Sequence, residues 1–145
     1  MRKKTIFLYL ILVAFILGTG ILKAQEIGLQ LYSLRNEFKN DVPGTFRLIK
    51  DWGITKIEDG NDGTQGYTMA EYQQLLKDNN LSMVSISAPF EELRDNPKNV
   101  VERAKGYGAK YAVCFWIPHK DTIFTIADTK MAVDVFNKAG KLLKN

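Results

Sequence analysis

Four short, mainly apolar runs recur along the chain at an almost constant interval. They occupy residues 27–33, 54–59, 82–88 and 110–116, and their starts lie 27, 28 and 28 residues apart. Runs of this length that are rich in β-branched and aromatic residues predict strands. A segment with apolar residues at helical spacing follows each run, so the pattern predicts four strand–helix units with parallel strands.

The predicted helices have recognisable ends. We expect them at residues 43–52, 69–79 and 97–107, with a fourth that starts near Lys130. Thr68 and Glu71 have the spacing of a capping box, which satisfies two amides at the start of the second helix. Asn96 is placed to cap the third helix. Gly53 and Gly108 follow the first and third helices, where only glycine adopts a left-handed turn without steric cost.

Polar side chains lie on one face only of two predicted strands. In the first strand Gln30 and Tyr32 share a face with Gly28, and in the third Ser85 and Ser87 share a face opposite Val84, Ile86 and Ala88. A parallel strand covered by helices on both sides is apolar on both faces. The pattern therefore favours an α/β fold of the (β/α)8 TIM-barrel type, whose inner face near the strand ends meets a ligand.

The chain is long enough for about the first four units of such a barrel. Eight units need about 250 residues, whereas residues 26–145 provide 120. We therefore expect residues 26–145 to be the N-terminal half of a barrel, either truncated or completed by a second chain. A small, complete flavodoxin-like sheet of four strands is the alternative, although doubly wound sheets usually contain five or more strands.

Six residues at or just beyond the predicted strand ends are candidate ligand contacts, because TIM-barrel active sites lie there. They are Gln30, Tyr32, Glu58, Ser87, Trp116 and His119. Structural alternatives stand beside the functional ones. Gln30 could be a buried amide, and Tyr32 could be a rim aromatic with its hydroxyl in water. Trp116 could simply close the barrel top, and His119 could be an ordinary loop residue.

Glu58 is the acidic candidate, and Asp59 follows it directly. A pair of acids at this point could bind a metal ion, act as a base or hold a sugar hydroxyl. Glu58 could equally pair with Lys56, two residues earlier on the same face. Cys114, the only cysteine, lies in the apolar fourth strand with no base near it in the sequence, so we interpret it as a small buried side chain.

The charge of the chain is concentrated at its start. The net charge of +4 comes from four basic residues among the first 24, whereas 16 basic and 16 acidic residues balance from Gln25 onward. A neutral folded part argues against nucleic acid as a partner. Basic residues 2–4 precede an uncharged apolar run at 6–22, which is the layout of a signal peptide. We expect residues 1–24 to be a cleaved signal peptide, with an uncleaved membrane anchor as the alternative, and hence a periplasmic or secreted protein.

The segments that follow resemble a known family. IGLQLYSLRNEF, with DVPGTFRLIKDWGITKIE after it, is similar to the start of secreted sugar phosphate isomerase/epimerase-like proteins of the xylose-isomerase-like TIM-barrel superfamily. APFEELRDNPKNVVERAKGYGAKYAVCFWIP resembles the third and fourth units of the same family. The resemblance implies a divalent metal, manganese or magnesium, and proton transfer beside the carbonyl of a sugar or sugar phosphate.

Two features separate the chain from the family pattern. The metal-binding Glu, Asp and His residues of the family come mainly from later strands, so the resemblance assigns no metal ligand and no catalytic residue in this chain. Many relatives also carry a His in the third strand just before a Pro-Phe pair, where this chain has Ser87 and Ala88. The substrate contacts that carry over by position are Gln30, Tyr32, Glu58 and Trp116.

The leading functional hypothesis is a secreted sugar (phosphate) isomerase or epimerase with metal-assisted proton transfer. On this hypothesis the chain holds the substrate side, and the metal-binding half lies outside it. One alternative is a lyase or hydrolase that acts on keto-glycosides. The other is a carbohydrate-binding fragment without catalysis.

Overall fold

The computed structural model describes residues 26–60 and 66–144, so the predicted signal peptide at residues 1–24 lies outside the described residues. The elements in chain order are β1 (Gly28–Gln30), the 3-10 helix η1 (Leu31–Leu34), α2 (Arg35–Asn40), α3 (Val42–Asp51), β2 (Lys56–Glu58), α4 (Met69–Asp78), β3 (Ser82–Ser87), α5 (Phe90–Asp95), α6 (Pro97–Tyr107), β4 (Tyr111–Val113) and α7 (Ile126–Leu143).

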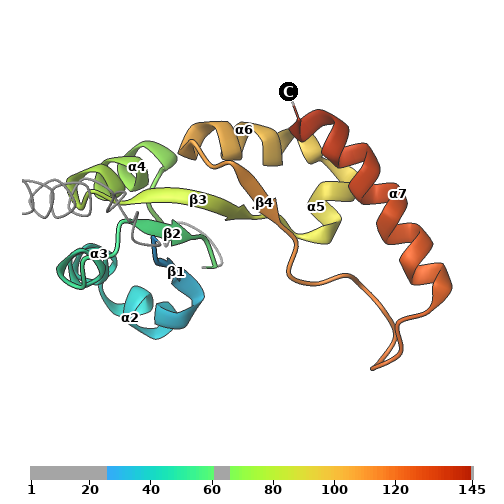
Figure 1. Ribbon diagram of the computed structural model, residues 1–145, viewed down its shortest axis with the longest axis horizontal. Coiled ribbons are helices and arrows are strands. Elements are labelled where there is room, and N and C mark those ends of the chain that lie inside the picture. The colour runs from blue at the N-terminus through green and yellow to red at the C-terminus, as the bar shows by residue number, and fades with distance from the viewer. Residues whose placement is uncertain (1–25, 61–65, 145) are drawn as a thin grey trace, which may run out of the picture.

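The four strands form one parallel sheet in the order β1-β2-β3-β4 (Figure 1). Each strand is added on the same side of the one before it, so right-handed crossovers place the connecting helices on a single face. A doubly wound sheet reverses its strand order and carries helices on both faces. The observed order therefore excludes the flavodoxin-like alternative and is that of consecutive strands in a barrel wall.

The hydrophobic core lies between the outer face of this sheet and the helices. Its largest fully buried side chains are Phe38, Phe46, Phe90, Leu31, Ile49, Ile57, Ile86 and Val100. A row of edge-to-face aromatic contacts runs through it, with ring centroids 5.1 Å apart for Phe38–Phe46, 5.3 Å for Phe46–Tyr72 and 5.9 Å for Tyr72–Tyr107. Such pairs add about 0.5–1.5 kcal/mol each beyond area burial, so the row ties α2, α3, α4 and α6 together.

Strands β1 and β4 are shorter than predicted. β1 ends at Gln30, opposite the last residue of β2, and β4 ends at Val113, opposite the last residue of β3. A strand ends where its neighbour ends because its amides and carbonyls then have no ladder partner. The prediction that Tyr32 and Trp116 lie on strands is therefore wrong, since Tyr32 belongs to η1 and Trp116 follows β4.

A register shift in β3 changes which of its residues face the helices. Met83 and Ile86 are both buried in the core, although strict alternation would put residues three apart on opposite faces. The pairing skips Val84, because Ile57 is opposite Met83 and Glu58 is opposite Ser85. Val84, the residue that the pairing skips, is only partly buried, whereas Ile86 is buried in the core. The bulge allows two large apolar side chains of one strand to reach the same core.

The three predicted helices that follow the first three strands are confirmed as α3, α4 and α6. The Thr68–Glu71 capping box is formed, and Gly53 and Gly108 adopt φ values of 76° and 66°. Asn96 precedes α6 as predicted, but its side chain makes no capping hydrogen bond. The six-residue helices α2 and α5 were not predicted, because they are too short to show helical periodicity.

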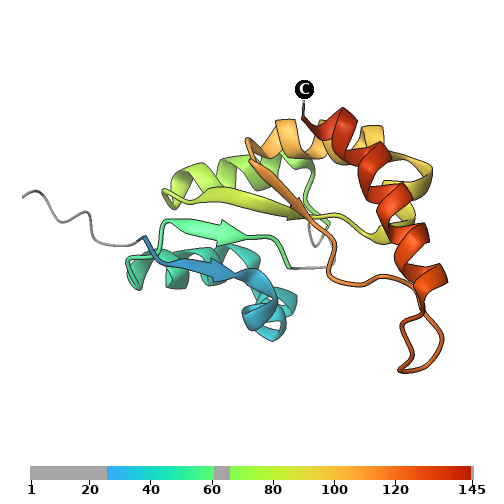
Figure 2. The same ribbon diagram turned by 45° about the vertical axis from the view of Figure 1, so that its right-hand side comes forward.

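The two ends of the sheet differ in what covers them. Figures 1 and 2 show α2 and α3 at one end of the molecule and α7 at the other, with the long connection after β4 projecting beside α7. Apolar side chains that are exposed gather on β4, this connection and α7: Tyr111, Phe115, Trp116, Ile123, Phe124, Ile126, Val133, Phe136 and Leu142.

Across the described residues, no helix is long and apolar enough to span a bilayer.

Candidate functional site

A carboxylate held across three strands is the centre of the candidate site. Gln30 Nε2 donates a hydrogen bond of 2.6 Å to Glu58 Oε1, and Ser85 Oγ donates one of 3.1 Å to Glu58 Oε2. The sheet register makes these contacts possible, because Glu58 on β2 is paired with Gln30 on β1 and with Ser85 on β3. All three side chains therefore lie on the inner face, opposite the core. Two donors fix both oxygens of the carboxylate at a set position.

A small hollow opens at the carboxyl ends of the strands, next to this carboxylate. It has a volume of about 260 Å³ and is lined by Gln30, Tyr32, Gly60, Ser87 and Phe115. These residues come from the end of β1, from η1, from the segment after β2, from the end of β3 and from the segment after β4. Every strand thus contributes to what we call the mouth hollow, at the end of the sheet where TIM-barrel sites are found.

Gln30 also lines a second, wider hollow that runs along strands β1 to β3. The wider hollow has a volume of about 740 Å³, and Glu58, Lys56, Val84 and Ser85 are among its lining residues. Glu58 is thus accessible from the inner side of the barrel wall. Its predicted alternative partner, Lys56, instead donates a 3.0 Å hydrogen bond to Ser82 Oγ.

Tyr32 reaches the mouth hollow although it is not on a strand. Tyr32 is 50% exposed, and the Arg35 guanidinium carbon lies 4.6 Å from the centre of its ring. Gly60 approaches it closely, since a Cβ at Gly60 would lie 2.8 Å from Tyr32 Cβ and 3.1 Å from Gln30 Cγ. Glycine is therefore needed at position 60 to let Tyr32 and Gln30 meet at the same hollow.

Trp116 and His119 lie together but away from the lining of the mouth hollow. Their ring centres are 4.4 Å apart, His119 also contacts Phe124 at 5.6 Å, and His119 Nδ1 donates to the Ile117 carbonyl at 2.7 Å. The aromatic residue that does line the hollow is Phe115, which is 51% exposed. Alternation could have identified Phe115, because Ser87 is paired with Val113 and Phe115 is two residues further on the same face.

The idea that Glu58 and Asp59 act as a pair of acids is wrong. Asp59 follows the last residue of β2, and its carboxylate accepts a 3.3 Å hydrogen bond from the Ser87 amide. Its charge also helps to raise the pKa of Tyr72 and Tyr107, for which burial is the larger cause. Asp59 therefore faces the helices, whereas Glu58 faces the ligand side.

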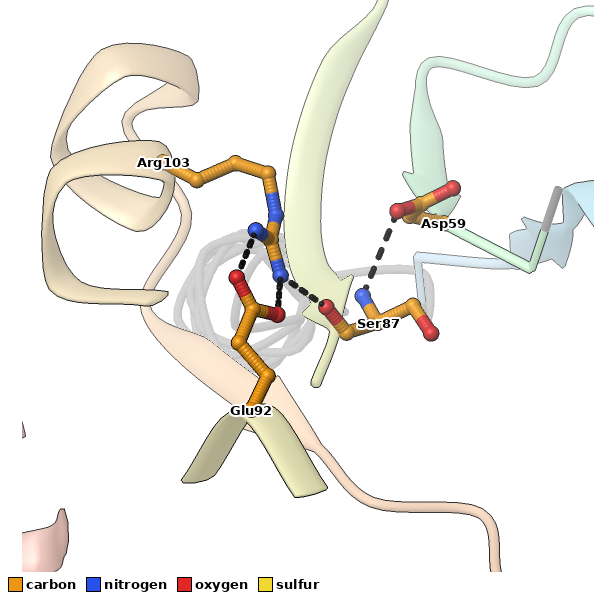
Figure 3. A network of polar contacts seen from close by, with 4 residues as sticks. All are labelled: Asp59, Ser87, Glu92 and Arg103. Atoms are coloured by element: carbon orange, nitrogen blue, oxygen red, sulfur yellow. Dashed lines mark hydrogen bonds and ion pairs between the residues drawn. The ribbon is translucent and has the colours of Figure 1, made fainter. Parts of the chain in front are cut away.

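A polar network holds the end of β3 from the helix side (Figure 3). Arg103 on α6 donates two 2.7 Å hydrogen bonds to the Glu92 carboxylate on α5, and its Nη2 also donates to the Ser87 carbonyl at 2.8 Å. The contact with Glu92 is the largest cause that raises the pKa of Arg103. Sequence patterns do not reveal this network, because Glu92 and Arg103 belong to different helices and match no motif.

The described residues do not by themselves fit a resident metal ion. They contain no group of three or more His, Cys, Asp or Glu side chains that could hold one. Each oxygen of Glu58 accepts one hydrogen bond from a neighbouring strand and keeps a further lone pair for a ligand, but one carboxylate is not a metal-binding group. Cys114 is partly buried, and burial raises the pKa of its thiol, which agrees with a structural interpretation rather than a nucleophile.

Comparison with known proteins gives matches at the level of structure. No family model and no curated protein sequence matches the chain. A sugar phosphate isomerase/epimerase from Parabacteroides distasonis superposes with a TM-score of 0.67 over 87% of this chain and 50% of its own, at 21% identity. The probable 3-DHS dehydratase AsbF of Bacillus anthracis, involved in petrobactin synthesis, gives a TM-score of 0.57 over 83% of this chain and 48% of its own, at 17% identity.

The chain has a partial TIM-barrel fold. It spans about half the length of the solved chains that it matches. A third neighbour, from Sinorhizobium meliloti, agrees, with a TM-score of 0.55 over 80% of this chain and 18% identity. The predicted fold class is confirmed, and the resemblance noted from the sequence agrees with structural neighbours that include a sugar isomerase/epimerase and a dehydratase.

Proposed function

We propose that this chain forms the substrate-holding side of a sugar isomerase or epimerase. The observation that supports this most is the mouth hollow, where the exposed rings of Tyr32 and Phe115 lie beside the Gln30 amide and the Ser87 hydroxyl. A sugar has apolar C–H faces that stack on aromatic rings and hydroxyl edges that need donors and acceptors. This combination of surfaces fits a sugar better than a purely apolar ligand.

Glu58 has two roles in this proposal. Held by Gln30 and Ser85 on the inner face, its carboxylate would accept hydrogen bonds from a sugar hydroxyl at a fixed position. A carboxylate near the sugar carbonyl is also the kind of group that moves a proton in aldose–ketose isomerisation. Among the described residues that line the mouth hollow there is no Lys or Arg, so this side of the site suits the sugar ring rather than a phosphate group.

The rest of the barrel and the metal belong to the same proposal. We propose that further βα units, on a continuation of the chain or on a second chain, close the barrel and supply the ligands of a manganese or magnesium ion. On this proposal residues 1–24 direct secretion, and the reaction occurs in the periplasm or outside the cell. The neighbouring sugar phosphate isomerase/epimerase structure supports the choice of reaction.

The test is calorimetric binding of D-fructose, D-xylose and D-psicose to the purified chain. We expect saturable binding of at least one of these sugars, and we expect Glu58→Gln to weaken it about tenfold, because an amide cannot replace a carboxylate as a double acceptor. Glu91→Gln, an exposed carboxylate on α5, is the matched control and should bind as the unmodified chain does. Absence of saturable binding to all three sugars would contradict the proposal.

A lyase acting on keto-glycosides is the second candidate, and one observation favours it. A dehydratase is among the structural neighbours, and elimination beside a carbonyl begins with the same proton removal as isomerisation. NMR of the products, with Mn²⁺ supplied, separates the two reactions, since isomerisation conserves the substrate mass and cleavage gives two pieces. Binding without turnover by this chain alone is expected for either reaction, because the proposed metal ligands lie outside it.

A further inference from the structure

The main chain of Ser87, at the end of β3, extends past the end of the neighbouring strand β2. In a parallel sheet the amide and carbonyl of one residue point to the same neighbour. The Asp59 amide donates to the Ser85 carbonyl, so the groups of Ser85 and Ser87 point toward β2. β2 ends at Glu58, which leaves the Ser87 amide and carbonyl without strand partners. Two side chains replace the strand, with the Asp59 carboxylate accepting from the amide and Arg103 donating to the carbonyl.

Arg103, which donates to the Ser87 carbonyl, is itself held in place by Glu92. Its two terminal nitrogens hold both oxygens of Glu92, and the two side chains are only 28% and 23% exposed. A two-point guanidinium–carboxylate contact restrains the orientation of the guanidinium as well as its distance. Figure 3 shows the Ser87 carbonyl directed at Arg103, with the hydroxyl on the other side of the residue.

The Ser87 hydroxyl is left available by this arrangement. Ser87 lines the mouth hollow together with Gln30 and Tyr32, and within the described part of the chain its Oγ has no hydrogen-bond partner. A hydroxyl on a main chain that is held from both sides can make a directed hydrogen bond at little entropic cost. If Asp59 and Arg103 served only to satisfy the Ser87 amide and carbonyl, the Ser87 hydroxyl would not need to face the mouth hollow.

We propose that Arg103 is a positioning residue, which with Glu92 and Asp59 holds Ser87 so that its hydroxyl contacts a sugar in the mouth hollow. The inference rests on the proposed sugar binding, and it adds a specific contact and the residues that orient it. Arg103 acts through Ser87 alone and touches no ligand. Its effect on binding must therefore vanish when the Ser87 hydroxyl is absent.

A double-mutant cycle tests this dependence. The dissociation constant for the tightest-bound sugar among D-fructose, D-xylose and D-psicose is measured by calorimetry for the unmodified chain, Ser87→Ala, Arg103→Lys and the double variant. Lysine keeps the charge but lacks the planar fork of donors that holds both oxygens of Glu92 while it reaches the Ser87 carbonyl. We expect each single variant to bind about fivefold more weakly, and the double variant to bind no more weakly than Ser87→Ala.

Two further variants separate positioning from general stability. Arg94→Lys changes an exposed arginine that forms an ion pair with Asp95 on α5, and it should leave the dissociation constant unchanged. Glu92→Gln keeps Arg103 but weakens the contact that orients it. Its dissociation constant should therefore lie between those of the unmodified chain and Arg103→Lys. Urea unfolding of each variant confirms that the binding measurements refer to folded protein.

The outcomes are distinct. Sugar binding that is unchanged in Ser87→Ala overturns this inference and leaves the proposed function standing. Losses that add fully in the double variant also overturn it, because Arg103 would then act independently of the hydroxyl. An unmodified chain that binds none of the three sugars overturns the proposed function and this inference with it.

Discussion

Glu58 illustrates how one side chain can belong to the fold and to a ligand site at the same time. Its two oxygens accept hydrogen bonds from Gln30 and Ser85, which joins three strands on the face opposite the core. The same bonds hold the carboxylate where the inner hollow reaches it. Because hydrogen bonds to charged groups contribute about 1.5–3 kcal/mol, removing the charge should be visible in stability as well as in binding.

Replacement of Glu58 by glutamine tests this structural role. The NH2 group of the new amide cannot accept a hydrogen bond, so either Gln30 or Ser85 loses its acceptor. We therefore expect Glu58→Gln to lower the free energy of unfolding by about 1–3 kcal/mol. Urea unfolding followed by circular dichroism measures the change. Glu91→Gln, on the exposed side of α5, should differ from the unmodified chain by less than about 0.5 kcal/mol. Equal stability of Glu58→Gln and Glu91→Gln would mean that the carboxylate does not join the strands.

Gly60 offers a second test at this scale. A Cβ there would lie 2.8 Å from Tyr32 Cβ, so Gly60→Ala should push Tyr32 out of the mouth hollow and cost about 1–3 kcal/mol of stability. Gly140→Ala on α7 is the matched control, since a Cβ at Gly140 meets nothing within 4 Å. We expect that change to stabilise the helix by up to about 1 kcal/mol. A Gly60→Ala variant as stable as the unmodified chain would contradict the close packing.

Sequence reasoning identified some of these residues and missed others for clear physical reasons. Strand alternation placed Gln30 on the inner face, and its position at a strand end made Glu58 a candidate; the structure brings the two side chains into contact there. Alternation also separates Glu58 from Asp59, which the interpretation as an acid pair overlooked. Arg103 could not be found from spacing, because its contacts with Glu92 and Ser87 depend on how α5 and α6 pack. Trp116 was misplaced because β4 stops at Val113.

At the scale of elements, capping residues define the helices more reliably than apolar periodicity does. The Thr68–Glu71 pair predicted the start of α4, and the structure contains that capping box. Periodicity placed the start of the last helix near Lys130, whereas α7 begins at Ile126 behind a second capping box of Thr125 and Asp128. The Thr-x-x-Asp spacing was present in the sequence and marks the correct start.

The second capping box predicts a dependence of stability on pH. Hydrogen bonds from Thr125 hold the pKa of Asp128 below its usual value of 3.8. A carboxyl whose pKa is lowered in the folded state stabilises the protein above its unfolded pKa, and this contribution is lost as the pH falls through the folded-state pKa. Asp128→Asn should therefore be less stable than the unmodified chain at pH 6, and the difference should shrink below about pH 4.

Urea midpoints measured at pH 6 and pH 3 provide this comparison. Thr125→Ala removes the partner and should cost about 1 kcal/mol at pH 6. Asp134→Asn, which changes an exposed acid in the middle of α7, serves as the control. Its stability difference from the unmodified chain should not change between pH 6 and pH 3. A difference between Asp128→Asn and the unmodified chain that stays constant from pH 6 to pH 3 would contradict the capping account.

At the scale of the whole molecule, the sheet has two open edges. Among the described residues, β1 pairs only with β2 and β4 pairs only with β3. Unpaired edge strands and exposed apolar side chains favour association. Tyr111 on β4 is 63% exposed, and Val133 on α7 is 50% exposed. These surfaces are where the next βα unit of a barrel would pack.

We expect the isolated chain to associate through this region as its concentration rises. Sedimentation velocity should show a sedimentation coefficient that increases with concentration, and Val133→Glu should reduce the increase by placing a charge in the contact. Met69→Glu, which changes an apolar residue 39% exposed on α4, is the control and should leave the association unchanged. A chain that stays monomeric at every concentration would show that the open edges are protected in another way.

The strand–helix repeat made the fold predictable at this scale, because four parallel units with one polar face are compatible with few architectures. The sequential strand order, which excludes a doubly wound sheet, required the structure. The mouth hollow also required it, since the described residues that line it come from parts of the chain as far apart as Gln30 and Phe115.

The most direct test of the account is residue-resolved NMR of the chain during titration with D-fructose. The account predicts saturable chemical-shift changes at the backbone amides of Gln30, Gly60, Ser87 and Phe115, at the carboxyl ends of the four strands. The opposite end of the sheet, at Asn80 and Leu81, should not respond. Saturable changes confined to that opposite end, or no saturable change anywhere, would contradict a sugar site at the mouth of the barrel wall.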